Sequence, residues 1–159
     1  MKDSNSISGL NVKPNSRTIL LADDEPNAEL VIRAFRSAGF ENPIHPVYRA
    51  EDIMQYLKGE GLYADRAKFA FPHLLLLDMV VPEIDGWSVV SWLSQRRNFP
   101  FLPVVVLTTS VAPAEEQKAR RLGLAAYEVK PATFQELVKV VDRIGTFWLL
   151  SPGLRKPET

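Results

Sequence analysis

The sequence contains no cysteine and only two histidines among its 159 residues. The lack of thiols excludes a disulfide framework, a cysteine zinc site and a redox dithiol. There is no excess charge of either sign, because 19 Lys and Arg balance 19 Asp and Glu. The overall charge therefore gives no indication of nucleic acid or an acidic membrane as a partner. No uncharged apolar run approaches the roughly 18 residues of a membrane span. The N-terminus has neither the apolar core of a signal peptide nor the Arg-rich stripe of a transit peptide, so we expect a cytoplasmic protein.

The composition is that of an ordinary globular domain, with 46% hydrophobic and 24% charged residues. A chain of about 150 residues buries roughly 70% of the surface of its unfolded form, which is enough for a core without disulfides. Residues 1–16 are rich in Ser, Asn, Lys and Pro and predict a flexible N-terminal tail. We expect one domain over residues 17–150, followed by a C-terminal tail over 151–159 that is too short for a DNA-binding or enzymatic effector.

Five short runs of β-branched residues or leucine predict strands, and segments with helical periodicity lie between them. The runs LLLL (74–77) and VVVL (104–107) are apolar at every position, which is typical of a parallel sheet with both faces covered by helices. The expected strands are Thr18 to Ala22, Ile44 to Val47, His73 to Leu77, Val104 to Leu107 and Ala125 to Val129.

Five helices are expected after these strands, because each intervening segment has a start or stop signal. The signals are Pro26 and Gly39 for the first helix, Gly59 after 50–58, Asp85 as the cap of the third, Gly123 after the thinly packed 113–122, and Thr133 with Glu136 as a capping box. Five strand–helix units with right-handed crossovers build a doubly wound, five-stranded α/β sandwich of the flavodoxin type. Its site is expected at the carboxyl ends of the strands.

Polar residues follow the predicted strands at the points where the strands end. Asp23 and Asp24 follow the first strand, Asp78 the third, Thr108 the fourth and Lys130 the fifth. Three carboxylates in one pocket would repel one another unless a cation joined them. Mg²⁺ prefers oxygen ligands, and no Cys or clustered His favours a softer metal. We therefore expect a Mg²⁺ site.

The same residues contain the parts that phosphoryl transfer requires. If Asp78 becomes an acyl phosphate, it exchanges its own charge for about two negative charges on the phosphoryl group. Mg²⁺ and Lys130 would offset most of the negative charge, and the hydroxyl of Thr108 could donate to a phosphoryl oxygen. A nucleophile, a metal, a cation and a hydroxyl donor suffice, because the protein mainly positions and stabilises the transferred group.

Four motifs together resemble the receiver domain of two-component response regulators: ILLADDEP (19–26), LLLLDMVVPEIDGW (74–87), VVVLTTS (104–110) and AYEVKPATFQEL (126–137). The resemblance implies that a histidine kinase phosphorylates Asp78 with Mg²⁺, and that Thr108 and Lys130 assist the transfer. It also implies that Asp23, Asp24, Asp78 and the backbone carbonyl of Val80 bind the metal. Thr108 and Tyr127 would form the switch, and the Lys130–Pro131 bond is expected to be cis.

Two further segments, together with one of these motifs, resemble the stand-alone regulators that partner bacterial phytochromes. They are the insertion GEGLYADRAKFAFPH (59–73), the string VVVLTTS and the ending FWLL (147–150). This resemblance implies a phytochrome-type histidine kinase as partner. Four adjacent large apolar residues cannot all be buried on one face of a helix end. We therefore hypothesise a homodimer or partner contact through 113–122, 125–129 and the last helix, with Phe147 and Trp148; a folded-back tail is the alternative.

Departures from the family pattern bear on the lifetime of the phosphorylated form. Val80 is apolar and cannot hydrogen-bond an attacking water, so we expect slow self-dephosphorylation. Ala132 follows Lys-Pro where Phe is frequent, which alters the expected shape of that loop. His45 and His73 lie at strand starts, far from the expected pocket, and we assign them no role.

Several functions remain as alternatives to a terminal regulator that signals by protein contact. The domain could pass phosphate onward to a histidine phosphotransfer protein. A Mg²⁺-dependent aspartyl-phosphate hydrolase usually has a second acid where Val80 stands. A flavin or nucleotide binder needs a phosphate loop, whereas LADDEP is acidic. An unphosphorylated receiver scaffold is disfavoured by the intact set of acids, Thr108 and Lys130.

Overall fold

The computed structural model describes residues 16–79, 81, 83–96, 99–109 and 112–150. The tails expected over 1–16 and 151–159 therefore lie outside the described residues, apart from Ser16. Within the described part of the chain, no helix is both long and apolar enough to cross a membrane.

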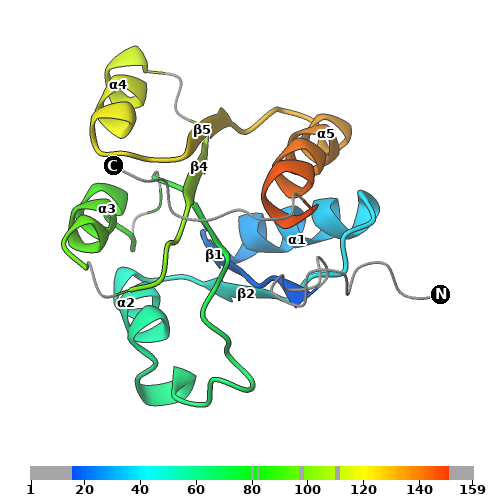
Figure 1. Ribbon diagram of the computed structural model, residues 1–159. Helices are drawn as coiled ribbons and strands as arrows, with labels where there is room; N and C mark the ends of the chain where they lie inside the picture. The colour runs from blue at the N-terminus through cyan, green and yellow to red at the C-terminus, as the bar shows by residue number, and fades with distance from the viewer. Residues whose placement is uncertain (1–15, 80, 82, 97–98, 110–111, 151–159) are drawn as a thin grey trace.

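One five-stranded parallel sheet forms the centre of the molecule, in the order β2-β1-β3-β4-β5 (Figure 1). The predicted strands are all present, although three of them begin one residue later than expected. The predicted flavodoxin-like α/β fold is confirmed. The strands are β1 (Ile19–Ala22), β2 (Ile44–Val47), β3 (Leu74–Leu77), β4 (Val104–Thr108) and β5 (Ala126–Val129).

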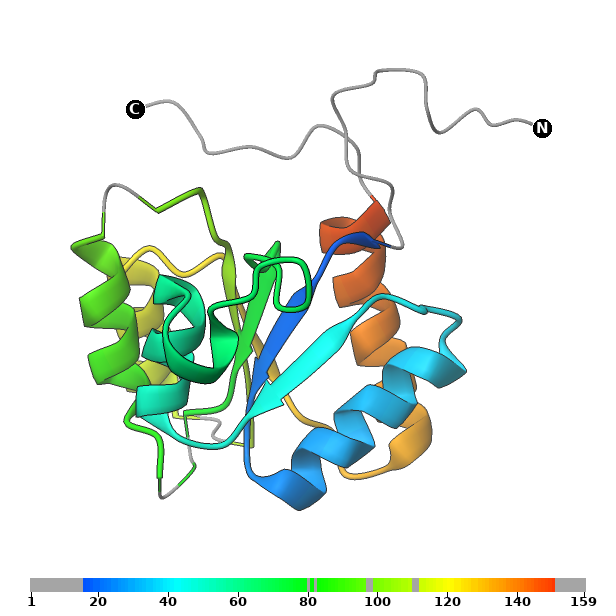
Figure 2. The same ribbon diagram turned by 90° about the horizontal axis from the view of Figure 1, so that it is seen from below.

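Among the described residues, five α-helices cover the two faces of the sheet, as predicted. Figures 1 and 2 show α1 and α5 on one face and α2, α3 and α4 on the other. The helices are α1 (Glu25–Ser37), α2 (Ala50–Lys58), α3 (Gly86–Ser94), α4 (Pro113–Arg121) and α5 (Phe134–Gly145). A short 3₁₀ turn, Gly61–Tyr63, follows α2, and a π-helical turn, Thr146–Leu150, follows α5.

The uninterrupted leucines of β3 supply both layers of the core. Leu74 and Leu76 pack with residues of α1 and α5, whereas Leu75 and Leu77 pack with residues of α2 and α3. All four are fully buried. Successive side chains of a strand point to opposite faces, so an all-apolar strand is what a sheet between two helical layers requires.

Most of the predicted helix signals act as expected. The Asp85 carboxylate accepts from the Ser88 amide at 3.3 Å and caps α3, and the Thr133 hydroxyl accepts from the Glu136 amide at 3.1 Å and caps α5. Helix α1 begins one residue earlier than expected, at Glu25. The reason is that Asp24 serves as its N-cap, which leaves Pro26 within the first turn.

The FWLL ending is only half buried. Leu149 is fully buried and Trp148 is half-buried, but Phe147 is 54% exposed and Leu150 is 46% exposed. The change to a π-helical turn after Gly145 moves these side chains off the regular face of α5. Two large apolar side chains therefore remain at the surface, as the sequence pattern predicts.

Candidate functional site

The candidate site lies at the carboxyl ends of β1, β3 and β5. Asp23 follows β1, Asp78 follows β3 and Lys130 follows β5. Each backbone amide still bonds to a neighbouring strand: Asp23 to Val47 at 3.2 Å, Asp78 to Ala22 at 3.0 Å and Lys130 to Thr108 at 2.8 Å. The three side chains are thus held by extensions of the sheet rather than by free loops.

A single ammonium group joins the two carboxylates. Lys130 Nζ donates to Asp23 Oδ2 at 2.6 Å and to Asp78 Oδ2 at 2.8 Å. The side chains are nearly buried, with exposed fractions of 9% for Lys130, 2% for Asp23 and 5% for Asp78. Such charge-assisted hydrogen bonds in a desolvated site are strong and fix the geometry.

Burial dominates the electrostatics of this site. Desolvation raises the pKa of Asp23 to about 6, although the hydrogen bond and charge of Lys130 act in the opposite direction. Burial also lowers the pKa of Lys130, but its bonds to Asp23 and Asp78 outweigh that effect, so the Lys130 pKa is raised overall. One ammonium therefore only partly compensates the acidic groups, and a further cation would be favourable.

Asp24 serves the adjacent helix. Its carboxylate accepts from the backbone amide of Asn27 at 2.9 Å and from the Asn27 side-chain amide at 2.8 Å. The bond to the Asn27 backbone is the main reason that the Asp24 pKa is lowered. Its own amide donates to Asp23 Oδ1 at 2.8 Å. Asn27 was not singled out from the sequence, although an Asp three residues earlier, next to Glu-Pro, is a typical cap signal.

The site thus brings together Asp23, Asp78 and Lys130, with Asp24 adjacent but turned toward α1. Among the residues that the structure describes, no three acidic or histidine side chains form a ready metal-binding group. Val80, whose carbonyl was expected to be a ligand, lies outside the described residues. By donor chemistry the site nevertheless fits a hard divalent ion, because its buried groups are carboxylate oxygens with incompletely compensated charge.

Thr108 contacts this group through Lys130, and Tyr127 lies in the strand that leads to Lys130. Thr108 ends β4, is fully buried, and accepts from the Lys130 amide through its carbonyl. Tyr127 is half-buried in β5 and lines a hollow of about 150 Å³ between α4 and β5, together with Ala119 and Leu124. The prediction of a cis Lys130–Pro131 bond was wrong, because this peptide is trans.

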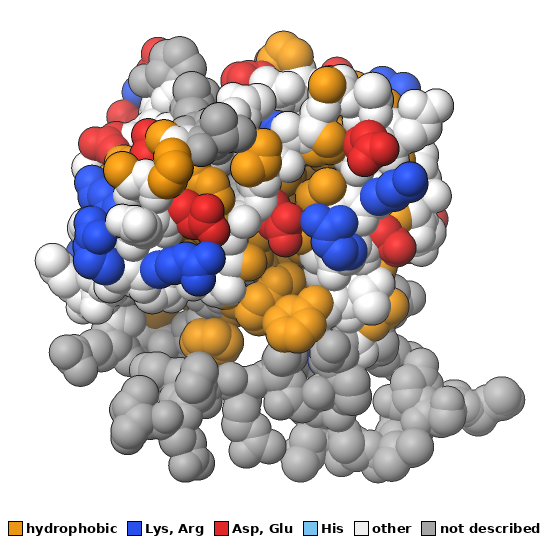
Figure 3. All heavy atoms as spheres, turned by 90° about the horizontal axis from the view of Figure 1, so that it is seen from above, with side chains coloured by type: hydrophobic (Ala, Val, Ile, Leu, Met, Phe, Trp, Pro, Cys, Tyr) orange, Lys and Arg blue, Asp and Glu red, His pale blue; other side chains and the backbone are white. Residues whose placement is uncertain are grey.

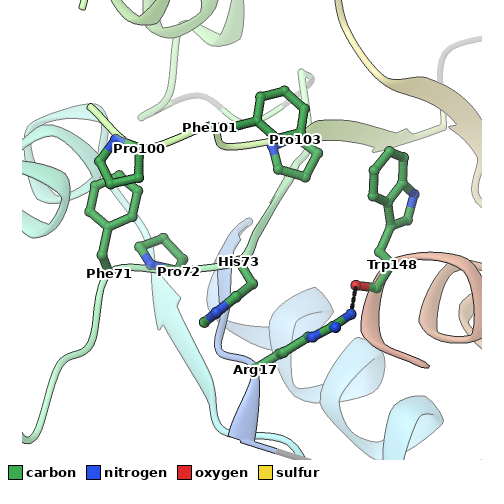
Figure 4. Close-up of a pocket in the computed structure, with 8 residues that line it drawn as sticks. All are labelled: Arg17, Phe71, Pro72, His73, Pro100, Phe101, Pro103 and Trp148. Atoms are coloured by element: carbon green, nitrogen blue, oxygen red, sulfur yellow. Dashed lines mark hydrogen bonds between the residues drawn. The ribbon is translucent and has the colours of Figure 1, made fainter. Parts of the chain in front are cut away.

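A separate hollow of about 270 Å³ lies at the opposite end of the sheet (Figure 4). Arg17 and His73 form its polar wall, and Arg17 donates to the carbonyl of Trp148 at 3.3 Å. His73 precedes β3, whereas Asp78 follows it, so this histidine is far from the candidate site, as expected. Burial lowers the pKa of His73.

Comparison with known families identifies the class of protein. The response regulator receiver domain matches residues 19–142. The chain therefore belongs to this family, and it holds one receiver domain of a two-component response regulator.

Individual relatives are similar to this chain over most of its length. A curated relative, the probable methanogenesis regulatory protein FilR2 of Methanothrix harundinacea, is 31% identical over 85% of this chain and 86% of that protein. The response regulator RPA3017, in red light signalling of R. palustris, is 30% identical over 87% of this chain and 99% of that one, with a TM-score of 0.80. The phosphorylated cyanobacterial phytochrome response regulator RcpA is 29% identical over 84% and 94%, with a TM-score of 0.75. The Mn²⁺-bound form of response regulator Rcp1 is 28% identical over 88% and 99%, also with a TM-score of 0.75.

Proposed function

We propose that Asp78 accepts a phosphoryl group from a phosphohistidine of a histidine kinase, with Mg²⁺, and that the protein then signals through protein contact. The observation that carries this proposal is the pair of hydrogen bonds from Lys130 Nζ to Asp23 and Asp78. A cation already touching the candidate nucleophile is positioned to bind an oxygen of an incoming phosphoryl group.

The transfer exchanges one bond to phosphorus for another. A carboxylate oxygen of Asp78 attacks the phosphorus, an acyl phosphate P–O bond forms, and the P–N bond of the phosphohistidine breaks. The leaving imidazole nitrogen keeps the electron pair and takes up a proton. Lys130 and the Thr108 hydroxyl stabilise the negative charge on the phosphoryl oxygens.

Mg²⁺ supplies charge neutralisation for the transferred group when it is bound. The residues that would hold it are Asp23, Asp24, Asp78 and the carbonyl of Val80. Asp24 would have to share its carboxylate with the cap of α1. The Mn²⁺ form of the relative Rcp1 supports a divalent ion here.

A phytochrome-type sensor kinase is the partner that we favour. The likeness to the phytochrome response regulator RcpA and to a regulator in red light signalling supports this assignment. The apolar side chain of Val80 offers no hydrogen bond to an attacking water, so the phosphorylated form is expected to hydrolyse slowly.

The output surface that we propose is the face formed by α4, β5 and α5, where Thr108 and Tyr127 would transmit the change. Figure 3 views the molecule from this side and shows hydrophobic side chains between acidic and basic ones. A hollow of about 560 Å³ lies there beside the exposed Phe147, and the Arg143–Glu128 ion pair of 3.0 Å is at its rim. A second copy could seat Phe147 in this hollow, which gives a self-complementary dimer.

Acetyl phosphate and Mg²⁺ test the phosphorylation directly. We expect the intact protein to gain the mass of one phosphoryl group and Asp78→Asn to gain none. Asp85→Asn is the matched control, because Asp85 lies in the same connection but caps α3. It should be phosphorylated like the wild type. An equal gain in Asp78→Asn would place the acceptor elsewhere, and an undiminished gain in the presence of EDTA would contradict the role of Mg²⁺.

A further inference from the structure

Helix α4 is the most weakly buried helix around the sheet. Of its nine residues, Pro113–Arg121, Ala119 is the buried one. Its ion pair, Glu116 with Arg120, lies within the helix and is exposed. Because so little of α4 is buried, its position depends more on individual contacts to neighbouring elements than the positions of the other helices do.

One such contact joins α4 to α3. The ammonium of Lys118 lies 4.6 Å from the ring centroid of Trp87, a distance typical of a cation–π interaction. The two helices lie side by side in both ribbon views (Figures 1 and 2). Lys118 is also close enough to Asp85 to help lower its pKa, after the larger effect of the bonds from Ser88.

Trp87 is fixed relative to the candidate phosphoacceptor. It lies in the first turn of α3, directly after Gly86. A Cβ at Gly86 would overlap the sulfur of Met79, the residue that follows Asp78. The start of α3 therefore packs directly on the residue that follows Asp78. A contact from α4 to Trp87 thus links the position of α4 to the neighbourhood of Asp78.

The other connection of α4 runs to Thr108. That residue ends β4, and α4 begins at Pro113. A movement of Thr108 toward a phosphoryl group on Asp78 would displace α4 relative to α3. The cation–π contact opposes this displacement.

We propose that the contact between Lys118 and Trp87 restrains α4 against α3 in the unphosphorylated protein and is released on phosphorylation. This inference rests on the proposed function of Asp78. An exposed cation–π contact shifts an equilibrium by about two- to fivefold. Loss of the restraint should favour the phosphorylated arrangement by that factor.

The test compares three variants. Lys118→Met removes the charge but keeps an unbranched side chain, and Lys118→Arg keeps a cation that can stack on Trp87. Arg96→Met is the matched control, because Arg96 lies 4.5 Å from the ring centroid of Trp92. Trp92 belongs to α3 and Arg96 follows the end of α3, so neither residue is part of α4. This control removes a similar contact without freeing α4.

Two measurements separate the restraint from the phosphorylation. In the unphosphorylated protein, Lys118→Met should exchange the amide hydrogens of residues Ala114–Arg121 of α4 about two- to fivefold faster than the wild type. Its initial rate of phosphorylation by acetyl phosphate should rise by a similar factor. Lys118→Arg and Arg96→Met should resemble the wild type in both.

Each result has a defined meaning. Unchanged exchange in Lys118→Met overturns the restraint, and so does an equal increase in Arg96→Met. Faster exchange with an unchanged phosphorylation rate overturns the coupling to Asp78. Absence of phosphorylation in the wild type itself counts against the proposed function and against the coupling, whereas the exchange measurement still decides whether Lys118 holds α4.

Discussion

Lys130 lies between two carboxylates that are almost entirely withdrawn from water. Taking charges out of water is costly, and the cost is offset only while the hydrogen bonds of the ammonium remain. Asp23 reports this balance, since burial raises its pKa to about 6, above the value of about 3.9 in an unfolded chain. The native state therefore binds the Asp23 proton more tightly than the unfolded state. The stabilisation from this effect is complete below about pH 3.9 and is lost as the pH rises through about 6.

Lys130→Met should lower the free energy of unfolding by about 3 kcal/mol in metal-free buffer at about pH 8, because it leaves two buried carboxylates without their cation. At about pH 5 the loss should be smaller, since Asp23, whose pKa burial raises to about 6, can then take up a proton. Urea denaturation at the two pH values measures both quantities. In the double variant Asp23→Asn/Lys130→Met, one of the two charges is gone, so part of the stability at about pH 8 should return. A loss that does not depend on pH would contradict this account.

At the scale of elements, the insertion 59–73 is an ordered part of the α2 layer. Tyr63 and Phe69 pack on Tyr56 with ring centroids 5.0 and 5.9 Å away. Arg66 closes the end of α2: its guanidinium donates to the carbonyls of Tyr56 and Leu57 at 2.8 Å each, and to that of Phe69 at 3.1 Å. A cation at a helix C-terminus satisfies the last carbonyls and complements the helix dipole.

Arg66→Met should therefore destabilise the protein by about 2 kcal/mol, because three carbonyls lose a charged donor. Urea denaturation provides the measurement. The matched control is Arg49→Met, which removes the exposed Arg49–Glu51 ion pair at the start of the same helix and should change stability far less. Equal effects of the two variants would show that the guanidinium does not cap α2.

Elements with a local signal could be predicted, and those that depend on distant contacts could not. The leucines of β3 and the caps Asp85 and Thr133 act through their immediate neighbours, so pattern and propensity suffice. The role of Arg66 depends on a turn that brings the Arg66 side chain back to the end of α2, and no periodicity in 59–73 predicts that turn. The π-helical turn after Gly145 was missed for a similar reason. A Cβ at Gly145 would come within 2.5 Å of Phe40, a residue far away in the chain.

At the scale of the whole molecule, the meeting of the candidate site residues could be predicted because parallel strands end at one edge of the sheet. Lys130 and Asp23 are 107 positions apart in the chain, yet strand order alone places both at the same edge of the sheet. What strand order does not determine is how the side chains are shared. Asp24 was expected beside the other acids, but its carboxylate has a local competitor in the free amides of the α1 N-terminus.

At the scale of the whole molecule, the exposed Phe147 also bears on whether the protein forms the proposed homodimer. Phe147 presents an apolar ring at a hollow that Ile144 and Trp148 also line, and burial of these side chains in a symmetric dimer would remove them from water. We expect sedimentation velocity at high protein concentration to show dimers of the wild type, more strongly with beryllium fluoride as the phosphoryl mimic, and monomers of Phe147→Asp. Leu62→Asp is the control, because Leu62 is also an exposed apolar residue but lies on the turn after α2, away from this face. It should associate like the wild type. A wild type that stays monomeric with and without the mimic would contradict the dimer.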